Sequence, residues 1–345
     1  MIPIYQPKFE RSSNLVRRLT VAAELRTWIQ QQSVDVSWIA EIQRDTLARL
    51  AHYSTRIEGN PLTLPEVRAL AEGKNLEIEA KAKREVMNYL ATLRWIWQKS
   101  PKKTIAEKDL LKMHQLLTAG TIPVSDVGAY KKAANAVFKG RQVIYRPPPP
   151  EAAPILTKSL LTWIGSNQAQ KEHILVMAAI VHHRLVSIHP VMDGNGRLAR
   201  ALESWVLYRK GFDTHHVFAL DEFFETDRPR YYWQIQKVRE EGEDLTSWLE
   251  YVAEGVVETL RKTQRRIQVL RAGAPAKRML LNRQQEQIMR TLGASPSMSG
   301  GEMAKALKVS RSNLSKLMKP LVEAGLVAKD GSTKSASYHL PSSKE

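Results

Sequence analysis

The spacing of apolar residues constrains the fold of this 345-residue chain more than any other feature, because they recur with helical periodicity along most of its length. Such a pattern lets each segment bury one face as an amphipathic helix. Before residue 271, the segments with this pattern are Leu15 to Gln31, Trp38 to Ile57, Glu77 to Trp97, Leu110 to Leu117, Ala152 to Trp163, Glu172 to Ser187, Gly196 to Lys210, Pro229 to Glu240 and Leu245 to Leu270. The sequence therefore predicts a mostly α-helical protein.

One short stretch favours strands instead. Val137 to Lys139 and Val143 to Tyr145 are β-prone and flank Gly140-Arg141, which predicts a β-hairpin. The proline run Pro147 to Pro150 follows and ends the second strand.

The C-terminal part predicts a separate small domain. A linker is expected at residues 271–276, followed by helices at 282–292, 300–307 and 310–324 and by β-prone segments at 326–329 and 337–340. Helices followed by a hairpin in this order indicate a winged helix-turn-helix, although Pro320 is expected to kink or shorten its third helix. We divide the chain into an N-terminal helical region (1–100), a core (101–270) and this winged domain (277–345).

The composition limits the classes of function. The net charge is +17, and residues 271–345 carry thirteen Lys and Arg against five Asp and Glu. This balance favours polyanionic partners such as nucleic acid, nucleotides or acidic proteins. The chain has no cysteine, which excludes disulfides, thiolate zinc sites and a cysteine nucleophile.

The sequence gives no sign of membrane targeting. Residues 1–10 lack the apolar core of a signal peptide, and the most apolar stretch, Ile174 to Val181, is too short to span a bilayer. We expect a soluble cytoplasmic protein with no membrane partner.

The run SIHPVMDGNGRLAR at residues 187–200 carries the strongest chemical signal. Pro190 cannot continue the preceding helix, so His189 is expected at a helix end beside a loop. Gly194 and Gly196 permit unusual backbone angles and close approach of a ligand. A new helix is predicted to begin at Asn195 or Gly196.

Each residue type in this run suits the handling of a phosphate. The first N–H groups of a helix are unpaired and bind anions, and Arg197 and Arg200 lie on one face of its first turns. Asp193 could hold Mg²⁺ between two phosphates, and His189 could take a proton from a hydroxyl. Taken singly, these residues also suit an ordinary helix cap, turn and solvated arginines, but their complementarity favours chemistry.

The run resembles the signature of the Fic family, His-x-Phe-x-Asp/Glu-Gly-Asn-Gly-Arg-x-x-Arg, in which x is any residue. It matches every fixed position except one, because Val191 stands where phenylalanine is usual. Valine keeps the apolar character of that position and reduces its volume, so we expect altered packing near the loop and intact chemistry.

The resemblance implies a Fic-type helical bundle and the activity of a protein adenylyltransferase, which transfers AMP from ATP to a Ser, Thr or Tyr hydroxyl of a target protein. It implies that His189 is the general base and Asp193 the Mg²⁺ ligand. The implied phosphate contacts are Gly194, Asn195 and Gly196 as an anion hole, with Arg197 and Arg200 on the outer phosphates.

Two further segments fit the resemblance. The stretch Tyr130 to Tyr145 is similar to the family's flap, and its hairpin at 137–145 is expected to dock the target by strand addition. The stretch Asp221 to Tyr232 is similar to the part that helps to close the nucleotide site, with Tyr231 and Tyr232 as candidate contacts. Its aromatic residues also suit a plain core.

The segment STRIEGN at residues 54–60 is similar to the family's inhibitory motif, Ser/Thr-x-x-x-Glu-Gly/Asn. Ser54 and Glu58 are four residues apart and share a helical face, and Gly59 is a good helix stop. The resemblance implies that Glu58 pairs with Arg200 and blocks the γ-phosphate of ATP. We therefore expect a self-inhibited enzyme.

The segment that begins at Ser310 has the composition of a recognition helix, with Ser310 as N-cap. Its candidate donors to DNA are Arg311, Asn313, Lys316 and Lys319, with Lys329 and Lys334 on a wing. Binding of a protein partner by this domain is the alternative.

Two other functions stay open. The chain could be a DNA-binding transcription regulator whose Fic-like part senses nucleotide without turnover, or an enzyme that removes AMP. A homodimer would offer a way to move the inhibitory helix.

Overall fold

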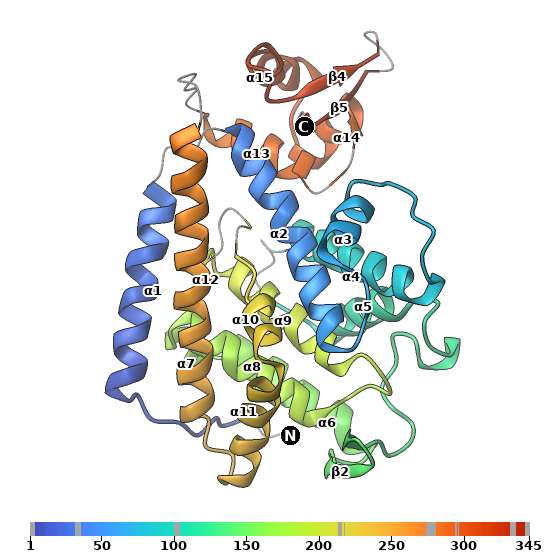
Figure 1. Ribbon diagram of the computed structural model, residues 1–345, viewed down its shortest axis with the longest axis vertical. Helices are drawn as coiled ribbons and strands as arrows, with labels where there is room; N and C mark the ends of the chain where they lie inside the picture. The colour runs from blue at the N-terminus through green and yellow to red at the C-terminus, as the bar shows by residue number, and fades with distance from the viewer. Residues whose placement is uncertain are drawn as a thin grey trace.

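The computed structural model of the chain describes residues 4–31, 36–99, 104–212, 216, 218–273, 281–293, 295, 297–331 and 336–341. It confirms the mostly α-helical fold with one β-hairpin and a C-terminal winged domain (Figure 1). Among the described residues, no helix has the length and apolar character needed to cross a bilayer.

The part of the chain before residue 274 forms the larger body. Its helices, in chain order, are α1 (Ser13–Gln31), α2 (Val36–Ile57), α3 (Leu64–Ala71), α4 (Ala80–Lys99), α5 (Glu107–Thr118), the 3-10 helix η1 (Val124–Asp126), α6 (Ala152–Gly165), α7 (Asn167–Lys171), α8 (Ile174–Ile188), α9 (Asn195–Arg209), α10 (Asp221–Thr226), α11 (Arg228–Glu240) and α12 (Thr246–Gly273).

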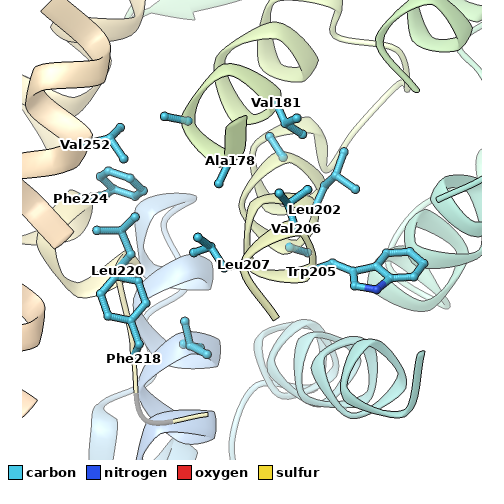
Figure 2. Close-up of a cluster of buried hydrophobic side chains, with 14 of the residues drawn as sticks. Ala178, Val181, Leu202, Trp205, Val206, Leu207, Phe218, Leu220, Phe224 and Val252 are labelled. Atoms are coloured by element: carbon cyan, nitrogen blue, oxygen red, sulfur yellow. The ribbon is translucent and has the colours of Figure 1, made fainter. Parts of the chain in front are cut away.

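Helices α8 and α9 pack against each other at the centre of this body. Both are buried along nearly their whole length, as expected for helices surrounded by others. Figure 2 shows Ala178 and Val181 of α8 beside Leu202 and Val206 of α9, with Trp205 directed toward a neighbouring helix. The buried apolar residues from Leu15 to Ile267 form one cluster. The proposed boundary at residue 100 therefore falls within a shared core.

The β-hairpin consists of β1 (Val137–Lys139) and β2 (Gln142–Tyr145), which pair antiparallel. Gly140 has φ 61°, a conformation that favours glycine at such a turn. The hydroxyl of Tyr145 donates to the carbonyl oxygen of Ser187 at 2.7 Å. This bond fixes the hairpin to the C-terminal end of α8, next to the candidate site.

The winged domain has its own apolar core, which lies between residues 288 and 340. Its elements are α13 (Arg283–Gly293), β3 (Met298–Ser299), α14 (Gly300–Leu307), α15 (Arg311–Glu323), β4 (Ala328–Asp330) and β5 (Ser337–His339). The strand β3 was not predicted; it pairs with β5, which makes a three-stranded sheet of order β3-β5-β4. Residues 274–276 of the expected linker and Lys334 lie outside the described residues.

The expected shortening of the helix at Pro320 is wrong, because α15 continues through it to Glu323. A proline inside a helix removes one backbone hydrogen bond. Burial of Leu317, Met318 and Leu321 on both sides of Pro320 holds the last turn of the helix in place.

The loop between α8 and α9 is closed by the side chain of Asn195. Its Oδ1 accepts from the N–H of Val191 at 3.1 Å, and its Nδ2 donates to the carbonyl oxygen of Val191 at 2.8 Å. The side chain of Asn135 donates to the same carbonyl oxygen at 3.0 Å. The backbone N–H of Lys131 donates to the carbonyl oxygen of Pro190 at 2.9 Å. These bonds set the position of the loop that carries the signature.

Candidate active site

His189 caps the C-terminal end of α8 in a left-handed conformation with φ 50°. Its Nδ1 lies 3.2 Å from the carbonyl oxygen of Val186. A carbonyl oxygen can only accept, so Nδ1 carries the ring proton. The lone pair of the neutral imidazole is therefore on Nε2, which leaves that atom able to accept a proton.

The environment of His189 keeps its imidazole uncharged. The pKa of His189 is lowered from 6.5 to about 4, mainly by burial, and the positive charges of Lys131 and Arg239 act in the same direction. Glu58 acts in the opposite direction and raises it. At pH 7 the ring is accordingly neutral and can act as a base.

The N-terminus of α9 lies in the same loop. Gly194 is its N-cap with φ 86°, and its carbonyl oxygen accepts the first helical bond from the N–H of Leu198 at 2.9 Å. The N–H groups of the first turn precede any intrahelical acceptor and carry a partial positive charge. Such a helix end favours a phosphate.

The buried side chain of Asn195, which is predicted to contribute to the anion hole, is used in the two bonds to Val191. Only its backbone N–H remains available for an anion. Val191 itself is buried, so the valine occupies an apolar position as expected.

Asp193 presents its carboxylate to solvent at the edge of the loop, with 61% of the side chain exposed. Nη2 of Arg197 lies 3.5 Å from Oδ1 of Asp193. No cluster of three or more His, Asp or Glu within the described ranges could hold a metal ion. A single exposed carboxylate beside an anion site fits Mg²⁺, which usually takes one or two protein carboxylates and completes its shell with phosphates and waters.

Arg197 is nearly fully buried and turns its guanidinium toward α4. Nη1 lies 3.8 Å from Oε1 of Glu85, and no hydrogen-bond acceptor for its Nε is found among the described residues. A buried donor without an acceptor is costly, so an anion or a water that accepted from this Nε would be stabilising.

Arg200 belongs to the second turn of α9 and is 1% exposed. Its Nε donates to Oγ of Ser54 at 2.7 Å, and its Nη2 donates to the carbonyl oxygen of Ser54 at 2.9 Å. Nη2 also forms an ion pair with Oε1 of Glu58 at 2.7 Å. The residues of the inhibitory motif thus meet the second signature arginine, although they are separated by more than a hundred positions in the chain.

Glu58 lies directly against the first turn of α9. A Cβ placed on Gly196 would overlap Oε1 of Glu58, so a larger residue there would make this carboxylate shift. The carboxylate of Glu58 thus lies at the N-terminus of α9, where negative charge is favoured.

A buried polar network supports Arg200 from behind. The hydroxyl of Tyr231 lies 3.4 Å from Nη1 of Arg200 and 2.9 Å from Nε2 of His182, whose Nδ1 is 2.7 Å from Oε2 of Glu203. Burial raises the pKa of Glu203 and lowers that of His182 to about 3, so this pair is uncharged. Asp221, whose Oδ1 is 3.3 Å from Nε of Arg200, faces the guanidinium from α10.

The two tyrosines proposed as nucleotide contacts occupy different environments. Tyr231 is 1% exposed and stacks on Phe224, so it holds Arg200 from within the core. Tyr232 is partly exposed, and its hydroxyl donates to the carbonyl oxygen of Ile57 at 3.2 Å, next to Glu58. Of the two, only Tyr232 has a ring surface that a ligand could reach.

His114 was missed by the analysis of the sequence. Its Nδ1 accepts from the N–H of Gly128 at 3.1 Å, which assigns the ring proton to Nε2, and Nε2 lies 3.0 Å from the carbonyl oxygen of Asp193. His114, which belongs to α5, thereby holds the signature loop at Asp193. No motif in the sequence marks it, because its partners are brought together only by the fold.

Two known families match this chain. Residues 104–207 match the Fic/DOC family, and residues 281–335 match the MarR family. The first match ends within α9 and contains the whole signature; the second covers α13 to β4 of the winged domain.

The curated relatives include the protein adenylyltransferase Fic of Drosophila mojavensis. It is 27% identical over 248 residues, which are 71% of this chain and 46% of that protein. The protein of the same name from Drosophila grimshawi is 26% identical over 260 residues, 73% of this chain and 51% of that protein. The chain thus spans about half the length of these relatives.

Solved structures show the same fold. A Fic family protein from Desulfovibrio desulfuricans G20 superposes with a TM-score of 0.68 at 23% identity, over 99% of this chain and 100% of that one. Fic-1 from C. elegans superposes with a TM-score of 0.63 at 24% identity, over 74% and 73% of the two chains. The chain therefore contains a Fic/DOC-family domain, which carries the site described above, together with a MarR-like winged domain.

Proposed function

We propose that this protein transfers the AMP moiety of ATP to a hydroxyl side chain of a target protein. The observation that supports this function best is the convergence on the first turn of α9: free helix N–H groups, Arg197 and Arg200, the exposed carboxylate of Asp193 and a neutral histidine with Nε2 available. The names of the relatives agree with this activity.

In this proposal the triphosphate of ATP lies along the N-terminus of α9. The N–H groups of Asn195 and Gly196 bind phosphate oxygens, and that of Gly194 joins them when it leaves Oδ1 of Asp193, to which it donates at 2.5 Å. The two signature arginines bind the outer phosphates through charge-assisted hydrogen bonds. The carboxylate of Asp193 would hold Mg²⁺, which neutralises phosphate charge when bound.

The chemical step exchanges one P–O bond for another. The hydroxyl oxygen of the target attacks the α-phosphorus, and the bond from this phosphorus to the β-phosphate oxygen breaks, so pyrophosphate leaves. Nε2 of His189 takes the hydroxyl proton during the attack. Electrostatic stabilisation by the fixed donors of the loop provides most of the acceleration.

The hairpin β1–β2 is the proposed docking place for the target. Its anchor at Tyr145 holds it beside α8, and Phe138 at its tip is 59% exposed. An extended segment of a target can add to such a strand edge by backbone hydrogen bonds.

We also propose that Glu58 inhibits the resting enzyme. While its carboxylate is paired with Arg200, the guanidinium is not free to bind the outer phosphate, and the negative charge repels it. Displacement of α2, for example by self-association of the chain, would release the arginine.

The variant Glu58→Gly tests both parts of the proposal. Removal of a charge-assisted contact with Arg200 should raise labelling of protein by ATP with a radioactive α-phosphate by about tenfold or more. Labelling is measured on the protein itself and on added cell extract, with Glu58→Gly/His189→Ala as the inactive control. Equal labelling of wild type and Glu58→Gly would contradict inhibition, and absence of AMP from both would contradict the transfer.

The proposed base can be tested by NMR titration of the His189 ring, assigned by its loss in His189→Ala. Because the pKa in the folded protein lies below the ordinary value, the ring should stay neutral as the pH falls from 8 to 6 and should gain a proton only near pH 4. The nitrogen shifts should show the proton on Nδ1. A midpoint near 6.5 would contradict the buried, neutral base.

The winged domain favours a second function, DNA binding, because it matches the MarR family and exposes basic residues on α15. Arg311, Lys316 and Lys319 are exposed on this helix, which begins at the N-cap Ser310. We propose that these residues contact DNA phosphates, which would make the enzyme also a regulator of transcription.

Fluorescence anisotropy with duplex DNA at several salt concentrations tests this function. Lys316→Ala should weaken binding and reduce the magnitude of the slope of log K against log salt by about 1. Lys112→Ala, which removes the same charge from an exposed site on α5, is the matched control. Equal binding by both variants, or none by the wild type, would contradict the proposal.

A further inference from the structure

A pocket of about 480 Å³ opens between α2, α10 and α12, away from the residues of the candidate active site. Its walls come from the middle of α2, including Ile42, Thr46 and Arg49, and from the C-terminal half of α12, including Lys262, Arg265 and Arg266. In Figure 1 the upper ends of α2 and α12 lie close together, and the two helices diverge downward. Helix α10 is seen between them in this view. Nothing in the proposed AMP transfer uses this space.

The charge of the pocket favours an anion. Four cations line it, and Glu222 is the one carboxylate among its lining residues. Glu222 is shared by two of the cations, because Arg49 lies 3.1 Å and Lys262 lies 3.5 Å from it. Lys262 also pairs at 3.1 Å with Glu258, which is not among the lining residues. No ion pair is found for the exposed Arg265 within the described part of the chain.

The carboxylate of Asp45, next to the pocket, is also surrounded by positive charge. Asp45 accepts from Arg49 at 2.7 Å and forms ion pairs with Arg68 and Arg266. Although burial raises its pKa, the positive charges of Arg266, Arg49 and Arg68 together hold the pKa of Asp45 below its ordinary value. The cations around the pocket therefore outweigh the acids that accompany them.

The buried hydroxyl of Thr46 points to a ligand independently of charge. Thr46 is fully buried and lines the pocket, yet its Oγ1 has no hydrogen-bond partner in the described structure. Buried polar groups are nearly always paired, because an unpaired one is costly. A molecule in the pocket could supply the missing bond.

We propose that this pocket binds a small organic molecule that carries phosphate groups. Arg49 and Arg265 bind the phosphates through guanidinium groups, which can donate in a bidentate way, and Lys262 binds them through its ammonium group. The hydroxyl of Thr46 donates to a further phosphate oxygen of the ligand. The volume exceeds that of the phosphates alone, so the rest of the molecule lies against the apolar walls formed by Ile42, Ala219 and Val269.

The location gives the ligand access to the inhibitory helix. The lining residues Ile42, Thr46 and Arg49 and the inhibitory residues Ser54 and Glu58 belong to the same helix or its end. A bound molecule would contact α2 about two turns before Ser54. The inference about the pocket itself does not depend on the proposed AMP transfer.

The test uses the full-length protein and inorganic pyrophosphate as probe, without Mg²⁺, by isothermal titration calorimetry at constant ionic strength. Arg265→Ala should weaken binding about tenfold, as expected for loss of a charge-assisted hydrogen bond. Arg261→Ala is the matched control, because it removes the same charge from an exposed site on α12 outside the pocket. It should change the affinity less than twofold.

Two more variants separate this pocket from other anion sites. Thr46→Val keeps the shape of the side chain and removes the unpaired hydroxyl, so it should fold and bind about threefold more weakly or worse. Arg197→Ala alters the candidate active site and should retain binding. Hydrogen exchange should show protection at residues 42–49 and 259–266 when pyrophosphate is present.

The proposal is wrong if wild-type protein binds no pyrophosphate, or if Arg265→Ala and Arg261→Ala bind equally. It is also wrong if Arg197→Ala alone abolishes binding, since the probe then sits at the active site. These outcomes can be reached whether or not the protein transfers AMP.

Discussion

A buried guanidinium organises the structure around the candidate active site. An arginine that is withdrawn from water must be compensated by opposite charge and by acceptors for its N–H groups, or it destabilises the fold. Arg200 finds acceptors in Ser54 and Glu58 from α2 and its end, a carboxylate in Asp221 from α10 and the hydroxyl of Tyr231 from α11. One side chain of α9 thus holds α2, α10 and α11 together.

This arrangement would link the proposed inhibition to the fold itself. If the carboxylate of Glu58 leaves, Asp221 and Ser54 can still compensate Arg200 from behind, so the charge need not move into water. The pair of His182 and Glu203 holds the hydroxyl of Tyr231 by a hydrogen bond without adding a net charge. The arginine can therefore remain in place while its outward partner changes from a carboxylate to a phosphate.

The parts that could be predicted from the sequence are those determined by local spacing. The helices follow from apolar periodicity, whereas the pairing of Glu58 with Arg200 is implied by the resemblance of residues 54–60 to the inhibitory motif of the Fic family. In contrast, His114 and the pair of His182 and Glu203 have partners far away in the chain, so no pattern of spacing identifies them. The extra strand β3 is only two residues long and is defined by its pairing with β5, which the sequence does not show.

Helix α2 has a role at each end. Near its beginning, α2 packs against α13 of the winged domain, and Arg44 donates to the carbonyl oxygen of Pro341 at 3.2 Å. At its C-terminal end it delivers Ser54 and Glu58 to Arg200. A change in the winged domain or in the pocket along α2 thus acts on the same rigid element that carries the inhibitory carboxylate, as a coupling between sites requires.

The central claim is that Glu58 occupies the place of the outer phosphate on Arg200. The most direct measurement compares the Kd values of ATP and AMP for the wild type and Glu58→Gly in the presence of Mg²⁺. If the claim is right, the variant binds ATP about tenfold more tightly, whereas AMP, which lacks the outer phosphates, changes less than twofold. An equal change for both nucleotides, or no change for ATP, would contradict it.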